Sequence, residues 1–403
     1  MKKFLTALII LSSIFLCGCT QKQDNKTILK FSSWGSRTEY GILQQVIQKY
    51  ENQNPNVKIE FIHVPENYFR KLHLLYASKT EPDVVFLNNT YAPLYIKAGL
   101  LEDLSGKFDE SKFFESSINC FKNEGKLYAI PRDVSNLVLY VNKDLIKNPQ
   151  KIKSLEDLKK VAKSVTKNDV FGLNYEENPL FWLYYLEYFG GGILSADGQN
   201  ALIGSPKSLE GIEFYTNLIN KDKSVPQKWQ MSSMTSAQMF IGGKTALYLS
   251  GRWLVPKFRE SIKFDWDIIP FPSSQNSQTL TDASGWAISK SSKNKDEAIK
   301  FVKFLSSDEV SKLFTETGLI TPANRSIAYS EAFLAPNKKP YNSKVFLDIL
   351  ENSKPTPVNS NYAKIVDEVT KNITPVLNGK KQTKDVFTID FTDRIQKLCL
   401  KSR

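Results

Sequence analysis

The chain has 403 residues, with 54 Lys and Arg against 42 Asp and Glu, a formal net charge of +12 and a pI near 9.2. This basic balance would suit a nucleic-acid partner, but the lysines are spread evenly, without an Arg-rich tract or an aromatic nucleic-acid motif, which excludes that class. The two histidines, His63 and His73, stand in no ligand spacing, so we expect no metal site and no cofactor.

The first residues predict an export signal. Lys2 and Lys3 form a positive head, and the apolar run from Phe4 to Leu16 follows it. A membrane-spanning helix needs roughly 20 apolar residues, so this run is too short to remain as a span. A charged head, a short apolar middle and a small residue before a cleavage point are typical of a secretion signal. No later apolar run is long enough to cross a membrane.

The end of this run resembles the bacterial lipobox, in which cleavage precedes a cysteine that then carries lipid. In "LCGCT" Cys19 fits that pattern, because small Gly18 precedes it, whereas bulky Leu16 precedes Cys17. The resemblance implies a signal peptide at 1–18, a lipidated Cys19 and a polar leash at 19–27. A plain signal peptide cleaved nearby is the alternative. Removal of residues 1–18 takes away two lysines and no acid, so the net charge falls from +12 to +10.

The pattern of residues 28–90 predicts a strand, a helix and two further strands. "ILKFSSW" is β-prone, and Thr38 can cap a helix that Pro55 ends. "VKIEFI" alternates apolar and polar residues, and "PDVVFLNN" is a short apolar strand that suits a sheet buried on both faces. The helix is expected to bury one face, formed by Ile42, Leu43, Val46, Ile47 and Tyr50.

Such βαβ units bind ligands just beyond the carboxyl ends of their strands. Two groups of residues follow strand ends here, and we expect both to face a cleft. They are Trp34, Ser36 and Arg37 after the first strand, and Asn88, Asn89 and Thr90 after the third. The second group could instead consist of ordinary strand-end caps, and Arg37 could be a solvated surface residue.

A second α/β region begins near residue 125. "LVLYVN" predicts a strand, Ser154 with Asp157 forms a capping box, and 209–219 predicts a helix. Strand-like segments follow in "TALYLS", "FDWDIIPFP" and "SGWAISKSS". Two amphipathic helices, "KDEAIKFVKFL" and "DEVSKLFTETG", come next, the second closed by Gly318. Cys120 and Cys399 are isolated thiols, which we expect to be buried rather than part of a disulfide framework.

Six segments in the right order resemble the family 1 extracellular solute-binding proteins of ABC importers, the class that includes maltose-binding protein. They are "QKYENQNPNVKIEF", "PDVVFLNNTYAPLYIKAGLLEDLS", "GKLYAIPRDVSNLVLYVNKDLI", "MFIGGKTALYLSGRW", "SGWAISKSSKNKDEAIKFVKFL" and "TGLITPANRS". Two departures stand out. Thr245 replaces the usual alanine in "GKTAL", and "SSWGSRT" lacks the acid and lysine that the maltose proteins carry in the first loop.

The resemblance implies a periplasmic-binding-protein-like α/β fold, in which two lobes are joined by several crossovers and hold the ligand between them. The crossings are expected near 132–134, 282–284 and 323–326. Lobe 1 would then comprise 28–133 plus 284–324, and lobe 2 would comprise 134–283 plus 325–403.

The resemblance also implies ligand contacts. Trp253 matches the stacking position of the family, Trp182 lies close to another aromatic contact, and Asp133 matches a ligand-binding acid. Core packing is the alternative for each tryptophan, and a hinge hydrogen bond is the alternative for Asp133. Trp266 lies within a strand pattern and is expected in the core. The remaining candidates are Trp34 and Trp286 beside predicted strand ends or glycine turns, together with Tyr175, Gly285 and Arg325.

The predicted function is a non-enzymatic receptor that delivers a sugar or oligosaccharide to an ABC permease. We expect a monomer that is exported, anchored to the membrane through Cys19, and free of nucleic acid. A receptor for a glycerol-phosphate-type or other small polar solute is the first alternative. A glycan-binding adhesin or a glycan-active enzyme is the second. An enzyme would need two carboxyls about 5–9.5 Å apart, and the sequence pairs none of Glu176, Glu177, Glu187 and Asp133 by a motif.

Overall fold

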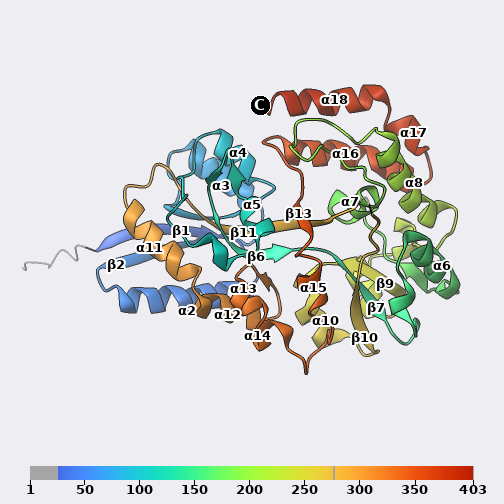
Figure 1. Ribbon diagram of the computed structural model, residues 1–403, viewed down its shortest axis with the longest axis horizontal. Helices are drawn as coiled ribbons and strands as arrows, with labels where there is room; N and C mark the ends of the chain where they lie inside the picture. The colour runs from blue at the N-terminus through green and yellow to red at the C-terminus, as the bar shows by residue number, and fades with distance from the viewer. Residues whose placement is uncertain (1–25, 276, 403) are drawn as a thin grey trace, which may run out of the picture.

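The computed structural model describes residues 26–275 and 277–402, so the predicted signal peptide and Cys19 lie outside the described residues. Figure 1 shows two lobes side by side, with strands passing between them. Each lobe contains its own β-sheet with helices packed on both faces, and the predicted two-lobe α/β fold is confirmed. Among the described residues, no helix has the length and apolar character needed to cross a membrane.

Lobe 1 is built around the larger sheet, whose order is β12-β6-β11-β3-β1-β2, with β13 paired to β11. Its first strands, β1 and β2, are parallel, and so are β1 and β3, whereas β11 runs antiparallel to both β3 and β6. The elements that begin this lobe are β1 (Thr27–Ser33), α2 (Arg37–Gln53), β2 (Val57–His63), α3 (Tyr68–Ala77), β3 (Val84–Asn88), α4 (Ala92–Lys97), η1 (Glu110–Lys112), α5 (Glu115–Asn119), β4 (Lys122–Asn123), β5 (Lys126–Leu127) and β6 (Ile130–Ser135).

Lobe 2 contains the smaller sheet, in the order β10-β7-β9-β8. Its strands are buried on both faces: Tyr140 and Tyr248 face one core, and Leu139 and Leu247 face the other. The elements are β7 (Val138–Asn142), η2 (Pro149–Lys151), α6 (Leu155–Val165), β8 (Phe171–Leu173), α7 (Pro179–Tyr188), α8 (Pro206–Asn220), η3 (Lys228–Met231), α9 (Ser236–Ile241), β9 (Thr245–Ser250), η4 (Arg252–Leu254), α10 (Val255–Ser261) and β10 (Trp266–Pro270).

The rest of the chain returns to lobe 1 and then crosses again. It forms β11 (Thr279–Ile288), α11 (Lys295–Leu305), α12 (Asp308–Glu316), β12 (Thr321–Pro322), α13 (Arg325–Ala328), α14 (Glu331–Leu334), α15 (Val345–Asp348), β13 (Ser353–Pro355), α16 (Tyr362–Leu377), α17 (Thr383–Val386) and α18 (Ile389–Leu400). The sequence expectation assigned 325–334 to lobe 2, but α13 and α14 pack on α12, whereas α15 packs on β10. The limits of the lobes therefore stay a proposal.

Local sequence signals explain the helix that begins beside the cleft. Leu43, Val46, Ile47 and Tyr50 of α2 are buried, as the periodicity predicts. The expected cap at Thr38 is wrong, because α2 begins two residues earlier with Ser36 as its N-cap. The Ser36 hydroxyl accepts a hydrogen bond from the backbone N–H of Glu39, and the Glu39 carboxylate accepts one from the N–H of Ser36. This reciprocal pair outcompetes a cap inside the first turn.

Other signals behave as predicted. Ser154 and Asp157 form the expected capping box of α6. Gly318 follows the C-cap residue of α12, Thr317, and its φ of +79° is the left-handed conformation that ends helices. Cys120 and Cys399 are both buried, as expected.

Candidate functional site

A row of cavities connects lobe 1 with lobe 2, and adjacent cavities share lining residues. The central cavity, of about 290 Å³, lies between the ends of β3 and α16. It shares Ser135, Trp253 and Ser284 with a second space of about 220 Å³, here called the arginine cavity. Together with the two outer cavities described below, these spaces form what we call the cleft.

The central cavity has polar walls interrupted by leucine side chains. The Asn89 side chain donates from Nδ2 to Asp282 Oδ1 at 2.8 Å and accepts from the N–H of Ala283 at 3.1 Å. Burial raises the pKa of Asp282, although the hydrogen bond from Asn89 acts in the opposite direction. The residues that line the central cavity include Asn88, Asn89, Thr90, Ser135, Asn136, Leu137, Asn178, Leu180, Leu183, Tyr184, Trp253, Leu280, Asp282, Ser284 and Tyr362. Donors and acceptors of this kind suit a ligand with many hydroxyls.

The arginine cavity has a buried ion-pair network in its wall. Arg132 Nε donates to Asp133 Oδ1 at 2.8 Å, and Arg132 Nη2 lies 3.1 Å from Glu39 Oε1. The guanidinium also lies 4.2 Å from the centre of the Phe86 ring. Burial would lower the pKa of Arg132, but the charges of Asp133 and Glu39 outweigh it and raise that pKa. Burial raises the pKa of Asp133 despite the arginine beside it. The positive charge of Arg132 is therefore compensated within the protein.

Arg252 also lines the arginine cavity, and among the described residues no carboxylate charge acts on its guanidinium. Its Nη2 donates to the carbonyl oxygen of Phe333 at 3.2 Å, and its guanidinium lies 4.0 Å from the centre of the Phe333 ring. Burial lowers its pKa, yet a guanidinium remains charged at neutral pH. Arg252 thus anchors the turn before α10 to the segment that crosses between the lobes.

Two tryptophans provide aromatic surface in the cleft. Trp253 is partly buried and lines both the central and the arginine cavities. Trp34 is partly buried too, and its ring centre lies 4.2 Å from that of Phe86. Trp34 and Glu39 are shared with an outer space of about 600 Å³, the first-loop cavity, which Ser36, exposed Arg37 and His63 also line. Apolar ring faces suit the C–H faces of a sugar.

The other outer space, the glutamate cavity, belongs to lobe 2 and has a volume of about 560 Å³. It shares Asn178 with the central cavity. Buried Tyr175 donates from its hydroxyl to Glu177 at 3.0 Å, and Lys228 lies 2.7 Å from the same carboxylate. Burial raises the pKa of Glu176 to about 7. This end of the cleft therefore carries acidic hydrogen-bond acceptors.

The structure brings most of the predicted residues to these walls. Nine line the cleft: Trp34, Ser36, Arg37, Asn88, Asn89, Thr90, Asp133, Tyr175 and Trp253. They come from five separate stretches of chain. For the residues after β1 and β3 this meeting is expected, because loops that follow parallel strands lie at one edge of a sheet. Asp133 instead lies within antiparallel β6.

Two predicted tryptophans lie in the cores instead. Trp182, on α7, is 1% exposed and donates from Nε1 to the carbonyl oxygen of Glu177 at 3.0 Å. Trp286 is fully buried, and its ring centre lies 4.6 Å from that of Phe86 and 5.5 Å from that of Phe31. Trp286 stands two residues beyond cleft-lining Ser284 on β11, opposite Phe86 of β3 and Ile130 of β6. Trp266 is buried in lobe 2, as expected.

Gly285 and Arg325 do not line the cleft either. A Cβ at Gly285 would lie 2.2 Å from the carbonyl oxygen of Ile130, so this glycine allows two strands to approach closely. Arg325 pairs with Glu351 at 3.3 Å, and both side chains are substantially exposed, at 41% and 46%. The arginine also lies 4.9 Å from the centre of the Phe114 ring. Each has a structural partner away from the cleft.

Several cleft residues had no signal in the sequence. Tyr184, Tyr362 and Arg252 reach the cleft only through the packing of lobe 2. Arg132 stands beside predicted Asp133, and the direct neighbours of a predicted acid would have been a reasonable place to search. Asp282 and Ser284 lie within an expected crossing segment, so their position in the hinge could have suggested a place in the cleft.

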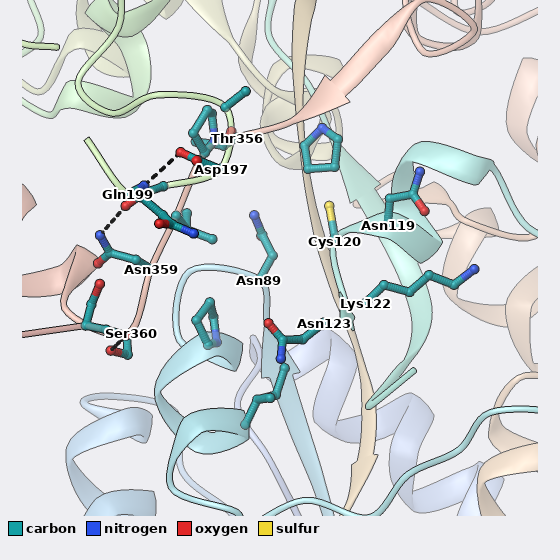
Figure 2. Close-up of a pocket in the computed structure, with 18 of the residues that line it drawn as sticks. Asn89, Asn119, Cys120, Lys122, Asn123, Asp197, Gln199, Thr356, Asn359 and Ser360 are labelled. Atoms are coloured by element: carbon teal, nitrogen blue, oxygen red, sulfur yellow. Dashed lines mark hydrogen bonds between the residues drawn. The ribbon is translucent and has the colours of Figure 1, made fainter. Parts of the chain in front are cut away.

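The largest of the described cavities, of about 890 Å³, lies elsewhere between the lobes. Figure 2 shows it between Asn89, Asn119, Cys120 and Asn123 of lobe 1 and two other segments, one with Asp197 and Gln199 and the other with Asn359. Here Asn359 donates to the carbonyl oxygen of Gly198 at 2.7 Å. Of the predicted ligand residues only Asn89 lines it, and of aromatic residues only Tyr128. It therefore lacks the stacking surface of the cleft.

Comparisons with known proteins agree with this architecture. The chain is 23% identical over 408 residues to the galactooligosaccharide-binding protein of Bacillus subtilis, covering 95% of this chain and 94% of that protein. It is 25% identical over 275 residues to a maltooligosaccharide ABC transporter solute-binding lipoprotein of Streptococcus pneumoniae, covering 64% and 63%. The structure is similar to the ABC substrate-binding protein Lmo0181 of Listeria monocytogenes in complex with cycloalternan, with a TM-score of 0.82, 26% identity and 92% and 98% coverage.

A family model supports the same relationship over most of the chain. The model of the bacterial extracellular solute-binding protein family matches residues 34–312, which include both lobes and most of the cleft walls. On the evidence of this match and of the two-lobe fold, the chain belongs to the bacterial extracellular solute-binding protein family.

Proposed function

We propose that this protein binds a neutral carbohydrate, a sugar or an oligosaccharide, in the cleft and delivers it to the membrane permease of an ABC importer. The observation that carries this proposal is the composition of the cleft wall. Two tryptophan rings lie beside side-chain amides, hydroxyls and carboxylates along one connected row of cavities. The relatives named for galactooligosaccharide and maltooligosaccharide binding support the same class of ligand.

The charges in the cleft favour a neutral sugar over a glycerol-phosphate-type solute. The central, arginine and glutamate cavities hold the carboxylates of Glu39, Asp133, Glu176, Glu177 and Asp282 against the cations Arg132, Arg252 and Lys228. A phosphate ester would need uncompensated cations close to its oxygens. Arg132 is already paired twice, Lys228 is paired with Glu177, and Arg325 lies outside the cleft. Arg252 has no carboxylate partner within the described chain, but its guanidinium is already held by the Ser343 hydroxyl, the Phe333 carbonyl oxygen and the Phe333 ring. The other predicted arginine, Arg37, lines the first-loop cavity and is exposed.

Binding without catalysis is part of the proposal, because the family to which the chain belongs consists of solute-binding proteins. A glycan-active enzyme would need one protonated and one ionised carboxyl on either side of a bond. Glu177 instead accepts from Tyr175 and pairs with Lys228, which suits a fixed acceptor of hydroxyl protons. A glycan-binding adhesin would share the cleft but would not need a permease.

Membrane anchoring through Cys19 and a monomeric state belong to the same proposal. The lipobox-like residues and the lipoprotein from Streptococcus pneumoniae support the anchor. The tether would hold the receptor beside its permease on the periplasmic or extracellular face. Our proposed division of the chain assigns residues 28–133 and 284–324 to lobe 1, and residues 134–283 and 325–403 to lobe 2. The packing of α13 and α14 on α12 favours moving its last boundary toward 335–344.

The proposal is tested by calorimetry on the purified mature protein. The titrants are maltooligosaccharides, galactooligosaccharides and cyclic glucans, with glycerol 3-phosphate in parallel. We expect at least one oligosaccharide to bind and the phosphate ester not to bind. Binding of the phosphate ester without any sugar would overturn the carbohydrate assignment and favour the alternative receptor. Conversion of a titrated glycan into products would instead point to an enzyme.

A further inference from the structure

The Trp253 side chain lies directly over the backbone of Gly251. A Cβ built on Gly251 would lie 1.9 Å from Cζ3 of the indole and 2.4 Å from both Cε3 and Cη2. These distances are far below van der Waals contact, so the ring occupies the volume in which a side chain at 251 would begin. All three of the nearest heavy atoms belong to Trp253.

The backbone of Gly251 does not itself require glycine. Its φ of −95° and ψ of −179° are extended values that any residue adopts. Many glycines serve left-handed turns, but here the steric demand comes from a ring two residues along the chain. The glycine is therefore explained by the position of the indole rather than by the path of the main chain.

Other contacts hold the turn without using a side chain at position 251. The hydroxyl of buried Tyr140 donates to the carbonyl oxygen of Gly251 at 2.8 Å. Arg252 donates to the carbonyl oxygen of Phe333 at 3.2 Å. Because both contacts would survive a methyl group at 251, the substitution Gly251→Ala selectively disturbs the indole.

We infer that Gly251 is a positioning residue for the Trp253 platform, which it keeps flat against the wall between the central and arginine cavities. With any side chain at 251, the indole would have to rotate away from the main chain and into the space that it lines. It would then take up ligand volume and lose its fixed orientation, and fixed orientation is what a binding platform requires. The effect on ligand affinity rests on the proposed function, whereas the ring position does not.

The test uses Gly251→Ala, Trp253→Ala, the double variant and Gly41→Ala. Gly41 is the matched control, because a Cβ there would meet no atom within 4 Å. Subtracting the emission of each Trp253→Ala protein from that of its Trp253 counterpart isolates the fluorescence of Trp253 without any ligand. Gly251→Ala should shift this difference spectrum to the red and increase its quenching by acrylamide. Once an oligosaccharide ligand is identified, Gly251→Ala should raise its Kd roughly tenfold in the protein that retains Trp253. In the Trp253→Ala protein, the same substitution should raise Kd less than twofold.

Each outcome decides the inference. An unchanged Trp253 emission in Gly251→Ala would overturn it, and so would an equal loss of affinity with and without the indole. A Gly251→Ala protein that folds only when Trp253 is also alanine would support it, because removing the ring removes the clash. Failure to fold in both backgrounds would assign Gly251 to the fold instead. A shifted emission with no sugar bound would leave the positioning role intact and count against the carbohydrate proposal alone.

Discussion

Arg132 Nη2 lies 3.1 Å from Glu39 Oε1, and this ion pair joins the strand that leaves lobe 1 to the first turn of α2. Both side chains line the arginine cavity, where Arg132 is 5% exposed and Glu39 is 13% exposed. The first cleft loop and the first crossover are therefore linked by buried charge. The link places a cleft-lining loop and a segment of the hinge in one electrostatic unit.

Replacing Arg132 should destabilise the protein strongly. Arg132→Met leaves Glu39 and Asp133 without their cation in a desolvated wall, which typically costs about 3–5 kcal/mol. Urea unfolding measures this loss. Arg325→Met is the matched control, because its pair with Glu351 is largely exposed and such pairs are worth about 0–1 kcal/mol. Equal losses for the two variants would show that the buried network does not have the stabilising role assigned to it.

Stability should fall with rising pH partly because of Glu176. Burial raises its pKa from 4.5 to about 7 in the folded protein. Between these values the folded state retains a proton that the unfolded state has lost, so raising the pH favours unfolding. Glu176→Gln removes this linkage, and its unfolding free energy should decline less between pH 4.5 and 7 than that of the parent. Urea midpoints across this window measure the difference, and parallel pH profiles would contradict the predicted pKa shift.

Trp253 and Trp266 should separate binding from stability. Trp253→Ala removes a partly buried ring from the cleft and should weaken oligosaccharide binding by roughly 2 kcal/mol, about 30-fold in Kd. Trp266 is 2% exposed in β10, so Trp266→Ala should instead cost about 3–5 kcal/mol of stability. Calorimetry and thermal unfolding of both variants test this pair. A large fall in Tm with unaltered affinity for Trp253→Ala would make Trp253 a core residue.

Ligand binding should close the lobes. The walls of the central and arginine cavities come from both lobes, so a ligand that contacts both walls favours the conformation in which they are close. Small-angle scattering with and without a saturating oligosaccharide should show a smaller radius of gyration in the complex. An unchanged scattering curve at saturation would indicate a site within one lobe or a rigid molecule.

The lipid anchor is tested by substitution at Cys19. Cys19→Ala should release the protein from membranes or leave an unprocessed precursor, because the acyl chains would have no attachment point. Membrane fractionation and the mass of the mature N-terminus measure this. Cys17→Ala is the neighbouring control and should remain anchored. If both variants behave like the parent, the lipobox interpretation is wrong.

The sequence by itself was sufficient for features that depend on neighbours along the chain. The buried face of α2 and the capping box of α6 follow from residues three or four positions apart, and both are present. Asn88 and Asn89 line the cleft because a short apolar strand ends there, a property that can be read from a few consecutive residues. The wrong prediction of Thr38 as the N-cap of α2 also concerns neighbouring residues, since Ser36 with Glu39 is the stronger capping pair.

Only the tertiary structure decided which aromatic residues line the cleft. Trp253, Trp182 and Trp286 all stand near turns or strand ends, yet only Trp253 lines the cleft. Whether a ring enters a core or a cavity depends on elements that pack from distant parts of the chain, such as Phe31 and Phe86 around Trp286. The contact of Arg132 with Glu39 spans two segments far apart in sequence. Such pairs form only when the strands take their places in the sheet, so no local pattern encodes them.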